Sequence, residues 1–236
     1  MRRCLLFFLL FYSFAQAQSL PDLSGYRTSG QKLQRLAELC DSLFFARNLA
    51  GERKLASYGL RISPSDDNFN RSRFHFYLGV VHENQVTMDS SEMHYLLSKK
   101  YAYLSGNAKR IRNALDRLFI IYSQHVGTTD RSKGVLRESL AFIDSTKNVK
   151  EKVALYASVA RYYNMIGQYE KQIFYLLKGI EGKKAMIANG LITDREEVVI
   201  DLVNLAEVYL DQEKSEKAIQ YLGEARPYRD CKMNSV

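Results

Sequence analysis

Residues 153–180 have the sequence VALYASVARYYNMIGQYEKQIFYLLKGI, and this stretch decides the fold class. In its first half, four residues recur at the spacing of one helix face: Tyr156, Val159, Ala160 and Tyr163. Gly167 and Gln168 interrupt this pattern, and a second apolar set at helical spacing runs from Tyr169 to Ile180. The stretch therefore predicts a helical hairpin. Because one hairpin cannot bury both of its apolar stripes, it needs a neighbouring hairpin on each side.

Comparable pairs of apolar helical segments recur along residues 31–226. One position in the first helix of each pair serves as a marker, and the five markers are 39 to 46 residues apart: Cys40, Gly79, Phe119, Ala160 and Ala206. Self-similarity at such a period is typical of a repeat array. The sequence thus predicts an all-α protein built from about five helical hairpins.

The two ends of the chain are predicted to lie outside the repeats. Residues 1–17 combine two arginines, an apolar run of eleven residues and Ala15-Gln16-Ala17, which is the arrangement of a signal peptide. Eleven apolar residues are too few for a membrane anchor, which needs about 20. We therefore expect an exported protein, in a periplasm or cell envelope. The predicted parts are a signal peptide at 1–17, a polar lead-in at 18–30, the repeat domain at 31–226 and a C-terminal tail at 227–236.

Composition excludes several classes of protein. The chain is 46% hydrophobic and 25% charged with only three prolines, which excludes a disordered or fibrous protein. Its formal charge of +8 favours an acidic partner. Beyond the signal peptide the only cysteines are Cys40 and Cys231, which lie at opposite ends of the remaining chain, Cys231 in the tail, so no disulfide is expected. Cys40 is predicted to be a small core residue.

The hairpins resemble those of the tetratricopeptide repeat (TPR) family. That family places Leu-Gly and then Tyr in the first helix of each repeat. Here Leu78-Gly79 precedes His82, and Leu205-Ala206 precedes Tyr209. The resemblance covers nearly all of residues 31–226 and implies a right-handed solenoid of about five TPR-like hairpins. The chain departs from the family in its longer period, near 40 rather than 34, and in Phe119 at a small-residue position.

This resemblance implies non-enzymatic binding of a protein or peptide in a groove lined by first helices. The ligand-binding candidates are first-helix residues that face away from the packing stripe: Arg161, Asn164, Asn204 and Glu207. Asn164 and Asn204 are the main candidates, because an asparagine in such a groove can bind a peptide backbone. The alternative is the N-terminal sensor region of a membrane signalling protein such as a histidine kinase. The tail has no polar capping helix, and contact with a membrane is expected only if the chain continues beyond residue 236.

Motifs of enzymes and cofactor sites are absent from the sequence: it has no phosphate-binding loop, nucleophile elbow, HExxH or CxxC pair. We expect no enzymatic activity, no catalytic residue and no cofactor. One cluster has the side chains of a transition-metal site, namely His75, His82 and His94 in the second hairpin. Metal binding by residues from two helices needs a geometry that spacing does not provide, so we expect no metal. In that interpretation His75 and His82 replace packing aromatics and His94 is exposed.

Residues 99–117 are strongly basic, with six lysines and arginines against Asp116 alone, and Tyr101 and Tyr103 lie among them. Cations with interleaved aromatics are also typical of a nucleic-acid surface. Export argues against that function, and we expect no nucleic acid. The segment is predicted to be solvated surface or a site for an acidic or anionic partner.

Overall fold

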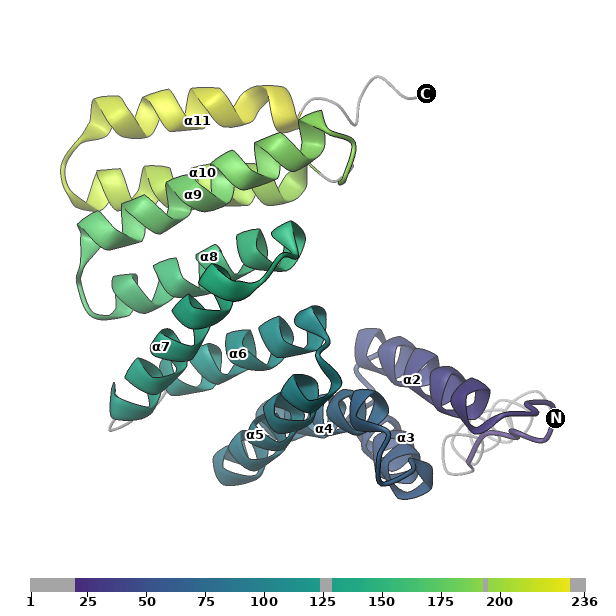
Figure 1. Cartoon of the computed structure of the whole chain (residues 1–236). Coiled ribbons are helices and arrows are strands. Elements are labelled where there is room, and N and C mark those ends of the chain that lie inside the picture. The colour runs from purple at the N-terminus through teal and green to yellow at the C-terminus, as the bar shows by residue number, and fades with distance from the viewer. Residues whose placement is uncertain (1–19, 124–128, 193–194, 230–236) are drawn as a thin grey trace, which may run out of the picture. The chain divides into compact units, whose positions relative to one another are not determined.

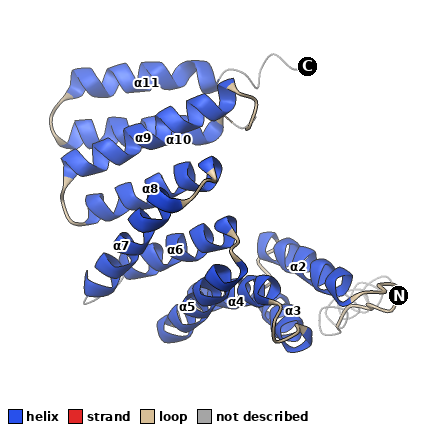
Figure 2. Ribbon diagram, viewed as in Figure 1, coloured by secondary structure: helices blue, strands red, loops and turns tan. Residues whose placement is uncertain are grey.

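The computed structural model describes residues 20–123, 129–192 and 195–229, so the predictions for residues 1–17 and Cys231 lie outside its described part. Within these ranges the chain forms ten helices and no strand (Figure 1; Figure 2), which confirms the all-α class. None of the described helices is long and apolar enough to cross a membrane. The helices are α2 (Ser29–Phe45), α3 (Leu49–Ile62), α4 (Asn68–Asn84), α5 (Met88–Ser105), α6 (Ala108–Ser123), α7 (Thr129–Ser145), α8 (Val149–Met165), α9 (Tyr169–Ala188), α10 (Glu196–Asp211) and α11 (Ser215–Arg229).

The helices pair in chain order, as the repeat pattern predicts. α2 packs on α3, α4 on α5, α8 on α9 and α10 on α11, and α6 and α7 form the remaining pair in sequence. The chain divides into two compact units, one ending at Ala114 and one beginning at Leu115. In the first unit α3 also packs on α4, and in the second unit α8 packs on α7 and α10 on α9. Figure 1 shows α8 to α11 side by side, each helix next to its neighbour in the chain.

Four hairpins share one turn geometry. Each has a three-residue connection whose middle residue is in the left-handed region, at φ values of 55° to 68°: Arg47, Val86, Gly167 and Glu213. The residue after it donates its backbone N–H to a carbonyl five residues earlier, as Gln168 does to Tyr163 at 2.9 Å. This bond pairs a carbonyl that the helix end would otherwise leave unsatisfied. The hairpins are thus repeats in backbone geometry as well as in sequence period.

Side-chain caps fix where several helices begin. Thr28 and Gln31 form a capping box at the start of α2, two residues before the predicted start at residue 31. Asn48, Asp67 and Asn148 each accept the backbone N–H three residues further on, at the starts of α3, α4 and α8. At the other end, α11 continues to Arg229 with a proline inside it, three residues beyond the predicted end of the repeats at 226.

The marker residues of the repeat are all buried. Cys40 is a free thiol with 0% exposure, which confirms its assignment to the core, and Ala160 and Ala206 are 1% exposed. A Cβ added at Gly79 would lie 2.5 Å from the ring of Tyr95, so this position requires a residue without a side chain. Phe119 is the exception in size and is still 3% exposed, because its ring packs on Tyr162 at 6.0 Å.

Candidate functional site

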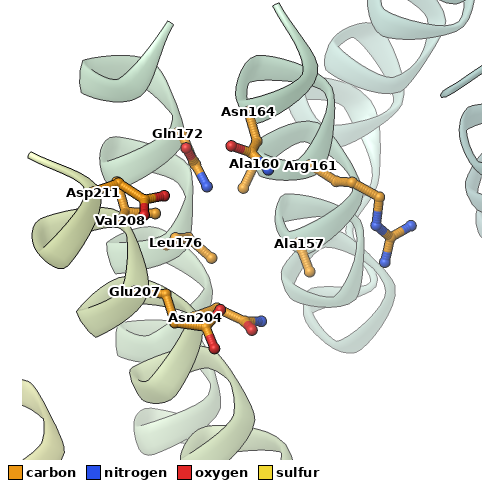
Figure 3. Close-up of a pocket in the computed structure, with 10 residues that line it drawn as sticks. All are labelled: Ala157, Ala160, Arg161, Asn164, Gln172, Leu176, Asn204, Glu207, Val208 and Asp211. Carbon is orange, nitrogen blue, oxygen red and sulfur yellow. The ribbon is translucent and has the colours of Figure 1, made fainter. Parts of the chain in front are cut away.

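A pocket of about 230 Å³ lies in the second unit, between α8, α9 and α10. Figure 3 shows the side chains from these three helices that line it. The helices are consecutive, and each packs on the next, so the hairpin α8–α9 and the first helix of the following hairpin form one concave surface. The lining residues are Ala157, Ala160, Arg161, Asn164, Gln172, Leu176, Asn204, Glu207, Val208 and Asp211.

All four predicted ligand-binding residues line this pocket. Arg161 and Asn164 come from α8, and Asn204 and Glu207 come from α10. Residues three apart lie on the same face of a helix, so each pair presents two polar groups on one side. All four side chains are exposed. The structure thus brings these residues to one place, and their binding of a ligand stays a prediction.

The floor of the pocket is apolar and belongs to the core of the second unit. Ala160, Leu176 and Val208 are 1%, 5% and 4% exposed, and all three are members of one buried cluster. Small side chains at positions 157 and 160 leave the space that the pocket occupies. An apolar floor with a few polar groups around it is the usual construction of a binding site.

Arg161 is the only positively charged lining residue, and its charge is already paired. Its Nη1 lies 3.4 Å from Asp116 Oδ1, which also accepts a hydrogen bond from the Ser158 hydroxyl. Figure 3 shows the Arg161 side chain extending away from α10, so its alkyl part borders the pocket while the guanidinium lies further out. The sequence did not indicate this ion pair, which joins residues 45 positions apart.

Two polar lining residues were not predicted as site residues from the sequence, Gln172 and Asp211. Gln172 is 7% exposed, and its Oε1 is buried without a hydrogen-bond partner in the described structure. Gln172 lies four residues before Leu176 and therefore on the buried face of α9. This spacing could have identified it from the sequence. Asp211 follows Asn204 by seven residues, two turns along the same face of α10, so extending that face would have found it.

The three histidines form a stack inside the α4–α5 hairpin. His75 and His82 are 6% and 9% exposed, which agrees with their expected role as packing aromatics. The prediction that His94 is exposed is wrong, because its ring stacks on His82 at 5.4 Å and its Nδ1 lies 3.0 Å from Nδ1 of His75. Burial lowers the pKa of all three rings, that of His75 to about 4. Within the described ranges no group of three His, Cys, Asp or Glu side chains is placed to hold a metal ion.

The basic segment 99–117 crosses the boundary between the two compact units, and its residues 99–114 belong to the first unit. There the aromatic ring of Tyr101 stacks on His75 at 5.6 Å and lies under the guanidinium of Arg71. Arg110 lies over the ring of Phe69 at 5.6 Å, and burial lowers the pKa of its guanidinium. Tyr101 thus contacts His75 and Arg71 within the α4–α5 hairpin, and the ammonium of Lys100 also lies 5.9 Å from the centre of its ring.

Comparisons with known proteins find solved structures of similar fold. No family model matches the chain, and no curated protein matches it. Among solved structures, BtubC (BKLC) from P. vanneervenii is similar with a TM-score of 0.70 and 15% identity, over 86% of this chain and 82% of that one. A putative kinesin light chain from Podosopora anserina with nearly identical TPR-like repeats has a TM-score of 0.61 and 15% identity, over 86% and 97% of the two chains.

A third similar structure is a Rap protein complexed with Competence and Sporulation Factor. It matches with a TM-score of 0.65 and 12% identity, over 87% of this chain and 56% of the Rap chain. At such identities the likeness concerns the fold alone. The chain therefore has a TPR-like helical repeat fold, as the resemblance of its hairpins to that family implied.

Proposed function

We propose that this TPR-like repeat chain is a non-enzymatic scaffold that binds a peptide or an extended protein segment between α8, α9 and α10. The observation that carries the proposal is the pocket itself, in which exposed polar side chains surround an apolar floor. Asn164 and Asn204 come from two different helices, and each side chain offers both a donor and an acceptor. A peptide backbone needs both kinds of partner along its length.

The comparison with the Rap protein supports the proposed binding of a separate peptide or protein. That structure was determined as a complex with Competence and Sporulation Factor, so a chain of this fold is known with a separate factor bound. The similarity is one of fold, and the pocket of this chain is argued from its own residues.

A selection from a phage-displayed library of random dodecapeptides on the immobilised full chain tests the proposal. Synthetic peptides from the selection are then measured against the variant Asn164→Ala/Asn204→Ala. Loss of two side-chain hydrogen-bonding partners is expected to weaken binding about tenfold or more. The helical content and the melting temperature should stay the same, because both side chains are exposed.

The matched control is Asn189→Ala/Gln220→Ala, which removes two exposed amides of the same unit outside the pocket. It should bind the selected peptides as the unchanged chain does. Equal loss in both variants, or unchanged binding by Asn164→Ala/Asn204→Ala, would contradict the assignment of the pocket.

We also propose that the protein acts outside the cytoplasm, on the strength of the signal-peptide pattern in residues 1–17. Mass spectrometry of the native product from its source cells should find an amino terminus at Gln18. A soluble envelope product close in mass to the chain from Gln18 onward supports a self-contained scaffold. A much larger, membrane-bound product supports the alternative, in which the chain is the sensor region of a signalling protein. A product that retains residues 1–17 in the cytoplasm contradicts export.

A further inference from the structure

The acidic residues of the pocket have no counter-charge. Glu207 and Asp211 lie four residues apart on α10, both line the pocket and both are exposed. Neither makes an ion pair or a side-chain hydrogen bond with another described residue. Like charges at this spacing on a helix repel each other, so a cation placed between them would be favoured.

The pocket's only cation does not neutralise these carboxylates. The guanidinium of Arg161 is paired with Asp116 at 3.4 Å, and Figure 3 shows it directed away from Glu207 and Asp211. The pair of Arg161 with Asp116 contributes no net charge, which leaves the pocket with two negative charges. This local sign is opposite to the net charge of the whole chain, +8.

Gln172 provides an independent indication of the chemistry of the ligand. Its side chain lines the pocket, is 7% exposed and has a buried carbonyl oxygen without a hydrogen-bond partner in the described structure. A half-turn of the terminal amide exchanges the positions of its oxygen and nitrogen, so the oxygen can also face the pocket. A buried acceptor without a partner is unfavourable, whereas the oxygen of the turned amide would face the pocket and could accept from a ligand that brings N–H donors.

We propose that the segment bound in this pocket carries a cationic group, either a lysine or arginine side chain or a free amino terminus, that pairs with Glu207 and Asp211. This inference rests on the proposed peptide-binding function and names the chemistry of its ligand. A volume of about 230 Å³ lies below the range of about 300–1,000 Å³ usual for whole small-molecule ligands. It suits one long side chain or a chain end, with Asn164 and Asn204 left to hold the adjoining backbone.

The test uses dodecapeptides selected on the full chain and the variant Glu207→Gln/Asp211→Asn, which removes both charges at nearly constant shape. Selected peptides should share a lysine, an arginine or a required free amino terminus, and their affinity should fall about five- to tenfold in the variant. Replacing the lysine by norleucine, replacing the arginine by citrulline, or acetylating the terminus identifies the source of the cation. A peptide altered in this way should bind the variant and the unchanged chain equally.

The control variant is Glu170→Gln/Glu216→Gln, which removes two exposed carboxylates of the same unit that do not line the pocket. It should retain full affinity, since only long-range attraction is changed. Peptides that need Asn164 and Asn204 but bind Glu207→Gln/Asp211→Asn at full strength would overturn this inference and leave the proposed function standing. Peptides that need neither pair of residues would overturn both.

Discussion

Lys183 Nζ lies 2.8 Å from Asp201 Oδ2, and the two side chains are only 7% and 5% exposed. Lys183 belongs to α9 and Asp201 to α10, so the ion pair joins two successive hairpins. Glu197 approaches the same ammonium at 3.3 Å from the solvent side. Burial raises the pKa of Asp201, while the Lys183 ammonium opposes that shift. Each charge is therefore tolerated in the core only because the other is present.

Lys183→Met should destabilise the protein strongly, because it leaves the Asp201 carboxylate buried without a partner. The expected loss is about 3–5 kcal/mol in the free energy of unfolding, measured by urea titration. The double variant Lys183→Met/Asp201→Leu should lose less than the single one. Lys178→Met breaks an exposed pair with Glu181 and should cost no more than about 1 kcal/mol. Equal losses at positions 183 and 178 would contradict the role of the buried pair.

The histidine stack predicts a loss of stability in acid. Burial, then His94 and Arg71, lower the pKa of His75 to about 4 in the folded chain, against 6.5 in the unfolded chain. Between these values only the unfolded chain binds the proton, so the contribution of neutral His75 is complete above pH 6.5 and is lost as pH falls through 4. His75→Phe keeps a ring against Tyr101 and should flatten the dependence of unfolding free energy on pH between 7 and 5. An unchanged slope would mean that His75 does not titrate in this way.

Glu52 predicts a pH dependence of the opposite sign. Its side chain is 0% exposed, and both carboxyl oxygens lack a hydrogen-bond partner in the described structure. Burial, then the charge of Asp41, raise its pKa to about 7, against 4.5 in the unfolded chain. The folded chain then holds a proton that the unfolded chain has released, so this contribution is complete below pH 4.5 and is lost as pH rises through 7.

Glu52→Gln should therefore flatten the decline in stability between pH 5 and 8, as followed by urea unfolding at each pH. The matched control is Glu170→Gln, since Glu170 is exposed and should leave the slope unchanged. A decline that persists in full in Glu52→Gln would place its cause in another group.

The helical period of the sequence predicted the hairpins and the direction of the first-helix residues. Spacings of three and four fix which residues share a face, and this is why Arg161, Asn164, Asn204 and Glu207 converge on one pocket. The burial of apolar residues near helix ends was less predictable. Tyr169 begins α9 and is 42% exposed, although its spacing fits the apolar set of that helix.

Contacts between distant residues could not be predicted in this way. The pairing of Arg161 with Asp116 and the stacking of His94 on His82 depend on how helices face each other, which a period does not specify. The shared turn could not be predicted from the sequence either. Among its four left-handed residues only Gly167 is a glycine, the residue type typical of that region.

Replacing Val86 by glycine should stabilise the protein. It has a φ of 57° although its side chain is β-branched, and it is 82% exposed, so the side chain gains little from packing. The left-handed region costs an L-residue about 1–2 kcal/mol, which glycine avoids. Val86→Gly should raise the free energy of unfolding by about 1 kcal/mol in urea titration. The reciprocal change at the equivalent turn, Gly167→Val, should lower it by about 1–2 kcal/mol, and a change of the same sign in both variants would contradict this account.

Gly79 should not tolerate even a methyl group. A Cβ at this position would lie 2.5 Å and 2.6 Å from two carbons of the Tyr95 ring. That ring is 0% exposed and its hydroxyl donates to Glu83, so it cannot move aside without breaking the hairpin contact. Gly79→Ala is expected to cost about 1–3 kcal/mol of unfolding free energy through overpacking. Gly223→Ala is the matched control in α11, where the added Cβ would meet no described atom within 4 Å apart from its chain neighbours and the backbone of its own helix. It should stabilise by about 0.5–1 kcal/mol because alanine is the better helix former. If Gly79→Ala also stabilised the protein, the inference that α4 and α5 approach closely at this repeat position would be wrong.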